Sequence, residues 1–140
     1  MDRNVVLTLT GCQRDLEGGE TVTELSAVAE CFERNGSLYI LYEESTEDGG
    51  MVKTRIKLKD SILEVARKGA MNTCMIFEAG REHMTEYTTP LGILQMGILT
   101  HSVETNQSDN RLAIEADYSL TNGGAEISRC NISIKIHNRV

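Results

Sequence analysis

The chain has 140 residues with 21 acidic and 14 basic side chains, which gives a formal net charge of −7 at neutral pH. This charge argues against nucleic acid or an anionic membrane as the main partner, because both require a positive protein surface. A chain of this length corresponds to one domain, so we expect residues 1–140 to form a single domain.

The N-terminal part contains two segments that we predict to be strands. Val5, Leu7 and Leu9 share one face of a two-residue alternation, which is typical of a half-buried strand. The segment Val22–Arg34 is ambiguous, because its apolar residues also fit a helical stripe. Its Thr-Val-Thr opening favours a strand, and a strand is therefore our prediction.

The alternation is cleanest between residues 52 and 59. One face carries apolar residues and threonine, and the other is basic: Val52, Thr54, Ile56 and Leu58 against Lys53, Arg55, Lys57 and Lys59. The basic face could meet an acidic partner or another subunit. A solvated face that guards an exposed strand is the favoured interpretation.

Pro90 is the only proline of the chain and marks a corner. Proline donates no backbone hydrogen bond, and Gly92 can adopt backbone angles that other residues avoid. We therefore predict one strand over Arg81–Thr89 and the next over Leu91–Thr105.

The C-terminal part also alternates, over residues 112–120 and 130–136. Turn signals recur at short and even spacing along the whole chain, which is typical of an all-β sandwich or barrel. We count about ten strands, and strands joined by short turns are antiparallel neighbours. So many antiparallel strands are expected to curl and close, and we predict a single antiparallel β-barrel.

Two segments are apolar on both faces, Leu38–Tyr42 and Leu91–Leu99. A strand of this kind is either buried on both sides or lies at a contact surface. Self-association as a homodimer is therefore an open alternative.

Four cysteines at positions 12, 31, 74 and 130 form no C-x-x-C pair. No apolar run has the length of a signal peptide core or a membrane span. We expect a cytoplasmic protein whose reduced thiols mostly act as small buried hydrophobes, and no membrane as a partner.

The order and spacing of several short segments resemble the YwiB-like family of bacterial proteins. The matching segments are Leu41-Tyr42-Glu43-Glu44, Lys53–Leu58, Arg67-Lys68-Gly69, Met75-Ile76-Phe77, Tyr87–Gly92 and the terminal strand Asn131–Ile136. The resemblance implies a calycin-like barrel related in shape to lipocalins and fatty-acid-binding proteins, with no assigned activity. The chain departs from the family pattern near Leu25–Phe32, where alanines stand in place of an expected glycine.

A polar cluster inside the barrel is the main candidate site. Arg67 shares a strand face with Leu63 and Val65, so we expect it to point inward. A buried guanidinium needs a partner, and the predicted partner is Glu43 or Glu44. With Tyr87 and Tyr118, Arg67 could hold a carboxylate ligand. The competing interpretation is a structural ion pair near the barrel mouth.

The sequence offers little support for catalysis or cofactors. His83, His101 and His137 lack the spacing of a metal site, and no nucleophile elbow, P-loop or dinucleotide motif is present. We therefore predict no catalytic residues, no metal and no cofactor, and a non-enzymatic role is favoured over an enzyme.

The leading functional hypothesis is a small barrel that binds a small, partly apolar and anionic ligand. The alternative is an interaction or structural module whose barrel is filled by its own side chains. An interior cavity of at least about 300 Å³ would distinguish the first from the second.

Overall fold

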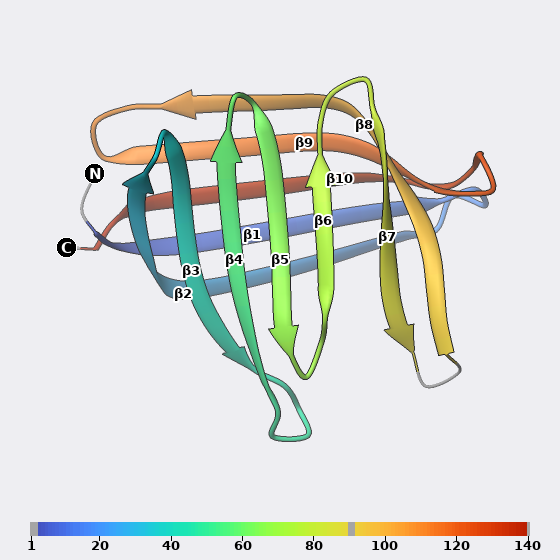
Figure 1. Ribbon diagram of the computed structural model, residues 1–140, viewed down its shortest axis with the longest axis horizontal. Coiled ribbons are helices and arrows are strands. Elements are labelled where there is room, and N and C mark those ends of the chain that lie inside the picture. The colour runs from blue at the N-terminus through green and yellow to red at the C-terminus, as the bar shows by residue number, and fades with distance from the viewer. Residues whose placement is uncertain (1–2, 90–91, 140) are drawn as a thin grey trace.

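The computed structural model describes residues 3–89 and 92–139, except for the side chains of residues 87–89. In this part of the chain ten strands form one sheet in the order β6-β5-β4-β3-β2-β1-β10-β9-β8-β7 (Figure 1). The strands are β1 (Asn4–Asp15), β2 (Glu20–Arg34), β3 (Ser37–Ser45), β4 (Met51–Lys59), β5 (Ile62–Gly69), β6 (Thr73–Phe77), β7 (Glu82–Thr89), β8 (Gly92–Gln107), β9 (Arg111–Asn122) and β10 (Ala125–Asn138). The predicted all-β architecture of ten antiparallel strands in a barrel is confirmed.

The sheet curls because two long strands take part in both of its layers. Strands β3 to β7 cross β1, β9 and β10 at a steep angle, and β8 bends from one direction to the other (Figure 1). Strand β2 pairs with β1 along Glu20–Glu30 but with β3 only along Glu30–Arg34. It is thus a strand throughout, which confirms the prediction for Val22–Arg34 over the helical alternative.

The first and last strands of the chain meet. β1 pairs with β10 in an unbroken antiparallel register from Val5↔Asn138 to Asp15↔Ser128. This ladder joins β2–β6 on one side to β7–β9 on the other, and it removes two edges that would otherwise be exposed.

The predicted corner at Pro90 lies outside the described residues. The two strands on either side of it are present, and β7 pairs with β8 from Glu82↔Leu99 to Thr89↔Gly92. The hairpin expected around this corner is therefore confirmed, with β8 ending at Gln107.

The barrel closes at a seam between β6 and β7, the two ends of the sheet. No backbone ladder joins these strands among the described residues. Instead, the Thr85 hydroxyl donates a hydrogen bond of 2.8 Å to the Cys74 carbonyl. The connection between the strands also bonds to β8, since the Gly80 N–H donates to the Thr100 carbonyl at 2.9 Å. A β-bulge in the β8–β9 ladder lies at this point, between Thr100 and Ser102.

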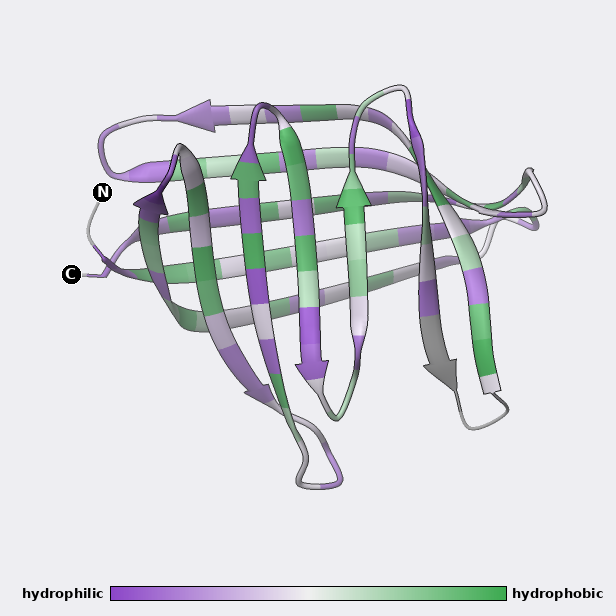
Figure 2. Cartoon of the chain, viewed as in Figure 1, coloured by the Kyte–Doolittle hydropathy of each residue, from purple (hydrophilic) through white to green (hydrophobic). Residues whose placement is uncertain are grey.

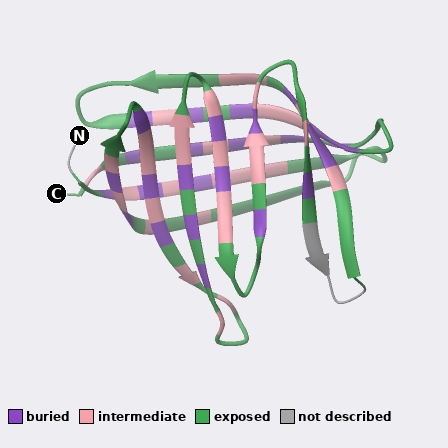
Figure 3. Ribbon diagram, viewed as in Figure 1, coloured by how far each residue is buried: buried purple, intermediate pink, exposed green. Residues whose placement is uncertain are grey.

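The core follows the two-residue alternation of the strands, which is visible in hydropathy and in burial (Figures 2 and 3). On β10, Ile132, Ile134 and Ile136 are buried, while Lys135 between them is exposed. All four cysteines are free; Cys31 and Cys130 are buried as expected, but Cys74 is exposed.

We predict a large loss of stability at one position of β10 and almost none at its neighbour. Ile134→Ala removes a side chain that is 1% exposed, and it should lower the free energy of unfolding by about 2–5 kcal/mol. Lys135→Ala removes an exposed side chain from the other face, and it should change that energy by no more than about 0.5 kcal/mol. Urea denaturation measures both, and similar losses would contradict the inward orientation of Ile134.

Candidate functional site

The inner face of β3–β6 is built from cross-strand rows, because residues opposite each other in the ladders stand side by side. Two rows are apolar and the third is polar. They consist of Leu38, Leu58, Leu63 and Phe77; of Ile40, Ile56, Val65 and Met75; and of Tyr42, Thr54, Arg67 and Thr73. We call the third set the polar row. Its Tyr42 lies three residues before the end of β3. The row therefore lies at the mouth of the barrel, where the β3–β4 and β5–β6 turns are found (Figure 1).

The β5–β6 turn sets Arg67 opposite Thr73. Gly69 ends β5 with a φ of 115°, a left-handed conformation that favours glycine. A Cβ at this position would lie 2.3 Å from the Met51 carbonyl oxygen, so no other residue fits without a shift of the backbone. Asn72 braces the turn through a hydrogen bond from its side-chain amide to the Gly69 carbonyl, at 3.2 Å.

The polar row has unused hydrogen-bonding capacity. Four polar atoms of the row are buried, and none has a partner with full hydrogen-bond geometry among the described residues: the Tyr42, Thr54 and Thr73 hydroxyls and the Arg67 Nε. The Tyr42 hydroxyl nevertheless lies close enough to Thr54 and Arg67 for both to affect its pKa. A buried polar group without a partner costs about 1–3 kcal/mol, and more where the group is charged. Such groups in a native protein normally bond to ordered water, an ion or a ligand.

Tyr42 is the one aromatic residue of the polar row, and it is buried at 4% exposure. Burial raises the pKa of Tyr42 above its usual range, and the neighbouring Thr54 hydroxyl and Arg67 guanidinium oppose this rise in the pKa. The hydroxyl therefore stays protonated at neutral pH, so that it can both donate and accept a hydrogen bond. Arg67 as a whole is half-buried, although its Nε is enclosed.

The inward position predicted for Arg67 is confirmed, but the predicted partner is wrong for Glu43. On β3 the buried face carries Ile40 and Tyr42, so Glu43 points outward. It is exposed and lies 3.8 Å from Lys53 in an ion pair. Glu44 shares the inner face, yet no ion pair joins Arg67 to either carboxylate in the described part of the chain.

Of the two predicted tyrosines, the structure describes the side chain of Tyr118 only, and it does not join Arg67. Tyr118 is half-buried on β9 and packs edge-to-face on Phe77, with ring centroids 4.8 Å apart. Phe77 belongs to the row farthest from the mouth, so the Tyr118 ring lies away from the polar row. Tyr87 belongs to β7, but its side chain lies outside the described residues.

The barrel interior is largely filled by its own side chains. Ile40, Ile56 and Leu63 are fully buried at 0% exposure, as expected for a close-packed core. A cavity of about 730 Å³ is present, but most of its lining residues face outward from β2–β5; the buried Ala29, Tyr42 and Thr54 also border it. A ligand site is therefore expected at the mouth of the barrel and not in a deep central chamber.

One other polar cluster could be mistaken for a catalytic centre. The Ser119 hydroxyl lies 2.8 Å from His101 Nε2 and donates a hydrogen bond to Glu126. Because the hydroxyl proton is directed at the carboxylate, the histidine is not placed to accept it as a general base. Ser119 is also 2% exposed, which keeps its oxygen from a substrate.

Over residues 3–89 and 92–139, no group of three histidine, cysteine or acidic side chains converges with the geometry of a metal site. No helix in this range is long and apolar enough to cross a bilayer.

Comparisons with known proteins agree with the barrel. The family model described as "Domain of unknown function (DUF1934)" matches residues 7–134. The uncharacterized β-barrel protein YwiB of Bacillus subtilis (strain 168) is 24% identical over 118 residues, which cover 84% of this chain and 82% of YwiB. The crystal structure of YwiB from Bacillus subtilis superposes with a TM-score of 0.85 at 21% identity, covering 99% of this chain and 93% of that one. The resemblance seen in the sequence is confirmed.

The stability of an Arg67 variant tests whether this arginine belongs to a structural ion pair. Because Arg67 has no carboxylate partner within the described part of the chain, Arg67→Met should not lower the free energy of unfolding by the roughly 3–5 kcal/mol that breaking a buried ion pair costs. We expect a change within about 1 kcal/mol, or a gain, in urea denaturation. A loss of the larger size would show that Arg67 is part of a structural ion pair.

The raised pKa of Tyr42 predicts a loss of stability in alkali. Its ionisation is harder in the folded chain than in the unfolded one, so its contribution is complete below about pH 10 and declines as pH rises above this value. Between pH 8 and 10.5 the unfolding energy of wild type should therefore fall more than that of Tyr42→Phe. The cysteines with raised pKa values are common to both proteins, so the difference isolates Tyr42. Equal losses would contradict the assignment.

Proposed function

This chain belongs to the DUF1934 family, and from that premise and the geometry of the polar row we propose that it binds a small anionic ligand at the barrel mouth. Arg67 receives the negative group, and Tyr42, Thr54 and Thr73 supply further hydrogen bonds. The protein acts by binding rather than by catalysis. We place it in the cytoplasm, where its free cysteines stay reduced.

The single observation that supports this proposal is the buried Arg67 Nε without an acceptor. A guanidinium has only donors, so the missing partner must be an acceptor. Carboxylate and phosphate oxygens match its planar fork and form hydrogen bonds about twice as strong as neutral ones. Water would satisfy the hydrogen bonds without neutralising the charge, whereas an anion does both.

The surroundings of the polar row define the rest of the ligand. The neighbouring row of Ile40, Ile56, Val65 and Met75 is apolar. A methionine at such a boundary adapts its shape to a neighbour. The proposed ligand is therefore a small amphipathic anion with a short apolar part that contacts this boundary.

The filled interior favours the alternative of a structural or interaction module for the deeper part of the barrel. Close packing of Ile56 and Leu63 leaves little room for a long acyl chain of the kind that wide barrels enclose. The two hypotheses thus apply to different parts of the same molecule, and only the mouth is proposed to bind a ligand.

A pair of probes with the same apolar part tests the proposal. Octanoate and 1-octanol differ in their head groups, so a site built around Arg67 should bind octanoate about ten- to a hundredfold more tightly. In Arg67→Met this preference should vanish. Arg14→Met is the matched control, because Arg14 is an exposed arginine of the β1–β2 hairpin paired with Glu20. Isothermal titration calorimetry measures all three proteins.

Three results would contradict the proposal. Equal affinity of wild type for octanoate and octanol would show that no anion site exists. Equal octanoate affinity of wild type and Arg67→Met would place the site elsewhere. Binding of neither probe up to about 10 mM would exclude an amphipathic anion of this size. Native mass spectrometry of the purified protein would in addition show any anion retained from the cell.

A further inference from the structure

The outer face of β2–β5 carries a groove of about 730 Å³. Two rows of outward-facing residues form it, because each residue stands opposite the next across the ladders. They are Glu30, Leu41, Arg55 and Ala66 in one row, and Glu43, Lys53 and Lys68 in the other. Its wall also includes Val28 and four further residues, Asn4, Ala29, Tyr42 and Thr54. We call this feature the outer groove.

One charge of the outer groove is left without an opposite partner among the described residues. Arg55 is bonded to Glu64 at 2.8 Å, Glu30 is paired with Arg3, and Lys53 lies 3.8 Å from Glu43. Lys68 has no carboxylate partner among the described residues, and it stands directly opposite Lys53 in the β4–β5 ladder. Like charges in this position destabilise a sheet, so an anionic occupant near both lysines would be stabilising.

The groove is also partly apolar. Val28 is 54% exposed, although Leu41 on the neighbouring strand β3 is half-buried. Leu41 and Ala66 are half-buried and form the floor between the charged groups. An occupant should therefore present an apolar side chain flanked by carboxylates.

The tip of the β1–β2 hairpin has this chemistry. Leu16 is 71% exposed, the most exposed large apolar side chain of the described residues, and it lies between Asp15 and Glu17. The carboxylate of Asp15 accepts hydrogen bonds from the backbone N–H groups of Glu17 and Gly19, at 2.9 and 2.8 Å.

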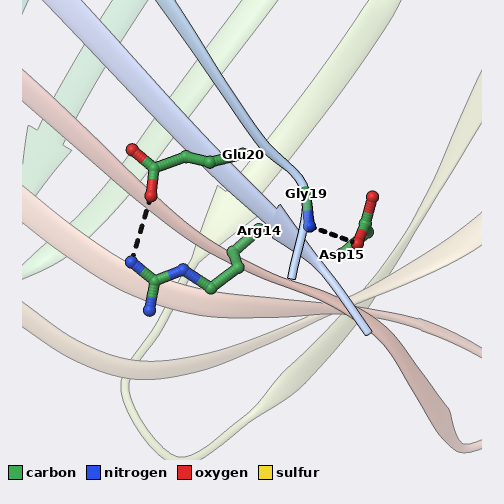
Figure 4. Close-up of polar contacts among 4 residues, drawn as sticks. All are labelled: Arg14, Asp15, Gly19 and Glu20. Atoms are coloured by element: carbon green, nitrogen blue, oxygen red, sulfur yellow. Dashed lines mark hydrogen bonds and ion pairs between the residues drawn. The ribbon is translucent and has the colours of Figure 1, made fainter. Parts of the chain in front are cut away.

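Further contacts hold the hairpin tip in one conformation. Arg14 pairs with Glu20 across its base at 3.1 Å, as Figure 4 shows beside the Asp15–Gly19 contact. The Asp15 N–H also donates to the Gly19 carbonyl at 2.9 Å. The tip therefore presents Leu16 with little conformational entropy left to lose on binding.

We propose that the outer groove binds the β1–β2 hairpin tip of a second copy of this chain. Leu16 of one copy packs against Val28, Leu41 and Ala66 of the other, and Glu17 lies beside Lys53 and Lys68. A second copy is favoured over a foreign partner because both complementary surfaces are present on the same molecule, and both are exposed. Tip and groove are different surfaces, so the contact is head-to-tail. A single hairpin tip buries less than the roughly 1,000 Å² of a stable interface, so the association is weak.

Sedimentation velocity at low ionic strength tests the proposal with charge reversals. Over about 10 µM to 1 mM the average mass of wild type should rise above the 15.5 kDa of one chain. Lys68→Glu and Glu17→Lys should each weaken self-association by about tenfold or more, since each places like charges in contact. An equimolar mixture of the two should recover it, because the unchanged tip of one variant meets the unchanged groove of the other.

Matched controls carry the same charge changes away from the contact. Lys135→Glu alters an exposed lysine of β10, and Glu47→Lys alters the exposed β3–β4 hairpin; both should associate as wild type does. Far-UV circular dichroism should show unchanged folding for all four variants, because every altered side chain is exposed. A wild type that stays monomeric at 1 mM would overturn the proposal. So would equal association of wild type and Lys68→Glu, or a mixture of the two reversals that remains monomeric.

Discussion

The ladder between β1 and β10 is the constraint on which the rest of the molecule depends. It joins the first and last strands of the chain over most of their length, from Val5↔Asn138 to Asp15↔Ser128. Each half of the sheet has only one free end left, at β6 or β7, and these ends meet at the seam bridged by Thr85. Since the side chains alternate along every strand, this closure fixes which face of the whole sheet becomes the interior. The apolar rows, the polar row and the outer groove all follow from that assignment.

The interior combines a packed core with a polar mouth. The apolar rows stabilise the fold by burial, whereas the polar row places unpaired hydroxyl groups and a guanidinium beside them. A buried polar network that is only partly satisfied is less favourable than an apolar core of the same shape. Functional sites commonly carry such a cost, because groups preorganised for a ligand cannot also satisfy one another. Four of these unsatisfied groups gather in the polar row, and this concentration is why we propose the mouth as the ligand site.

Much of this architecture could be predicted from the sequence, because strand parity is a local property. The faces of β4 and β10, and the shared face of Arg67 with Leu63 and Val65, could be read directly. Parity shows which residues share a face, but it does not show which face is inside when both are apolar. On β3 this ambiguity placed Glu43 in the interior, although Ile40 and Tyr42 occupy it. The contributions of Thr54 and Thr73 were missed because their hydroxyl groups join Arg67 only through the register between strands.

The two proposed sites lie on opposite faces of one ladder. Thr54↔Arg67 and Lys53↔Lys68 are consecutive pairs of β4 and β5, the first facing the mouth and the second the outer groove. Both are proposed to attract negative groups, on a chain whose net charge is −7. They differ in their exposure to solvent, because Arg67 Nε is buried whereas Lys53 and Lys68 are exposed. Salt screens exposed charges over a Debye length of about 8 Å at physiological ionic strength but acts far less on buried ones. Added salt should therefore weaken contacts at the outer groove well before it weakens an anion held by Arg67, and this separates the two sites by physical behaviour as well as by position.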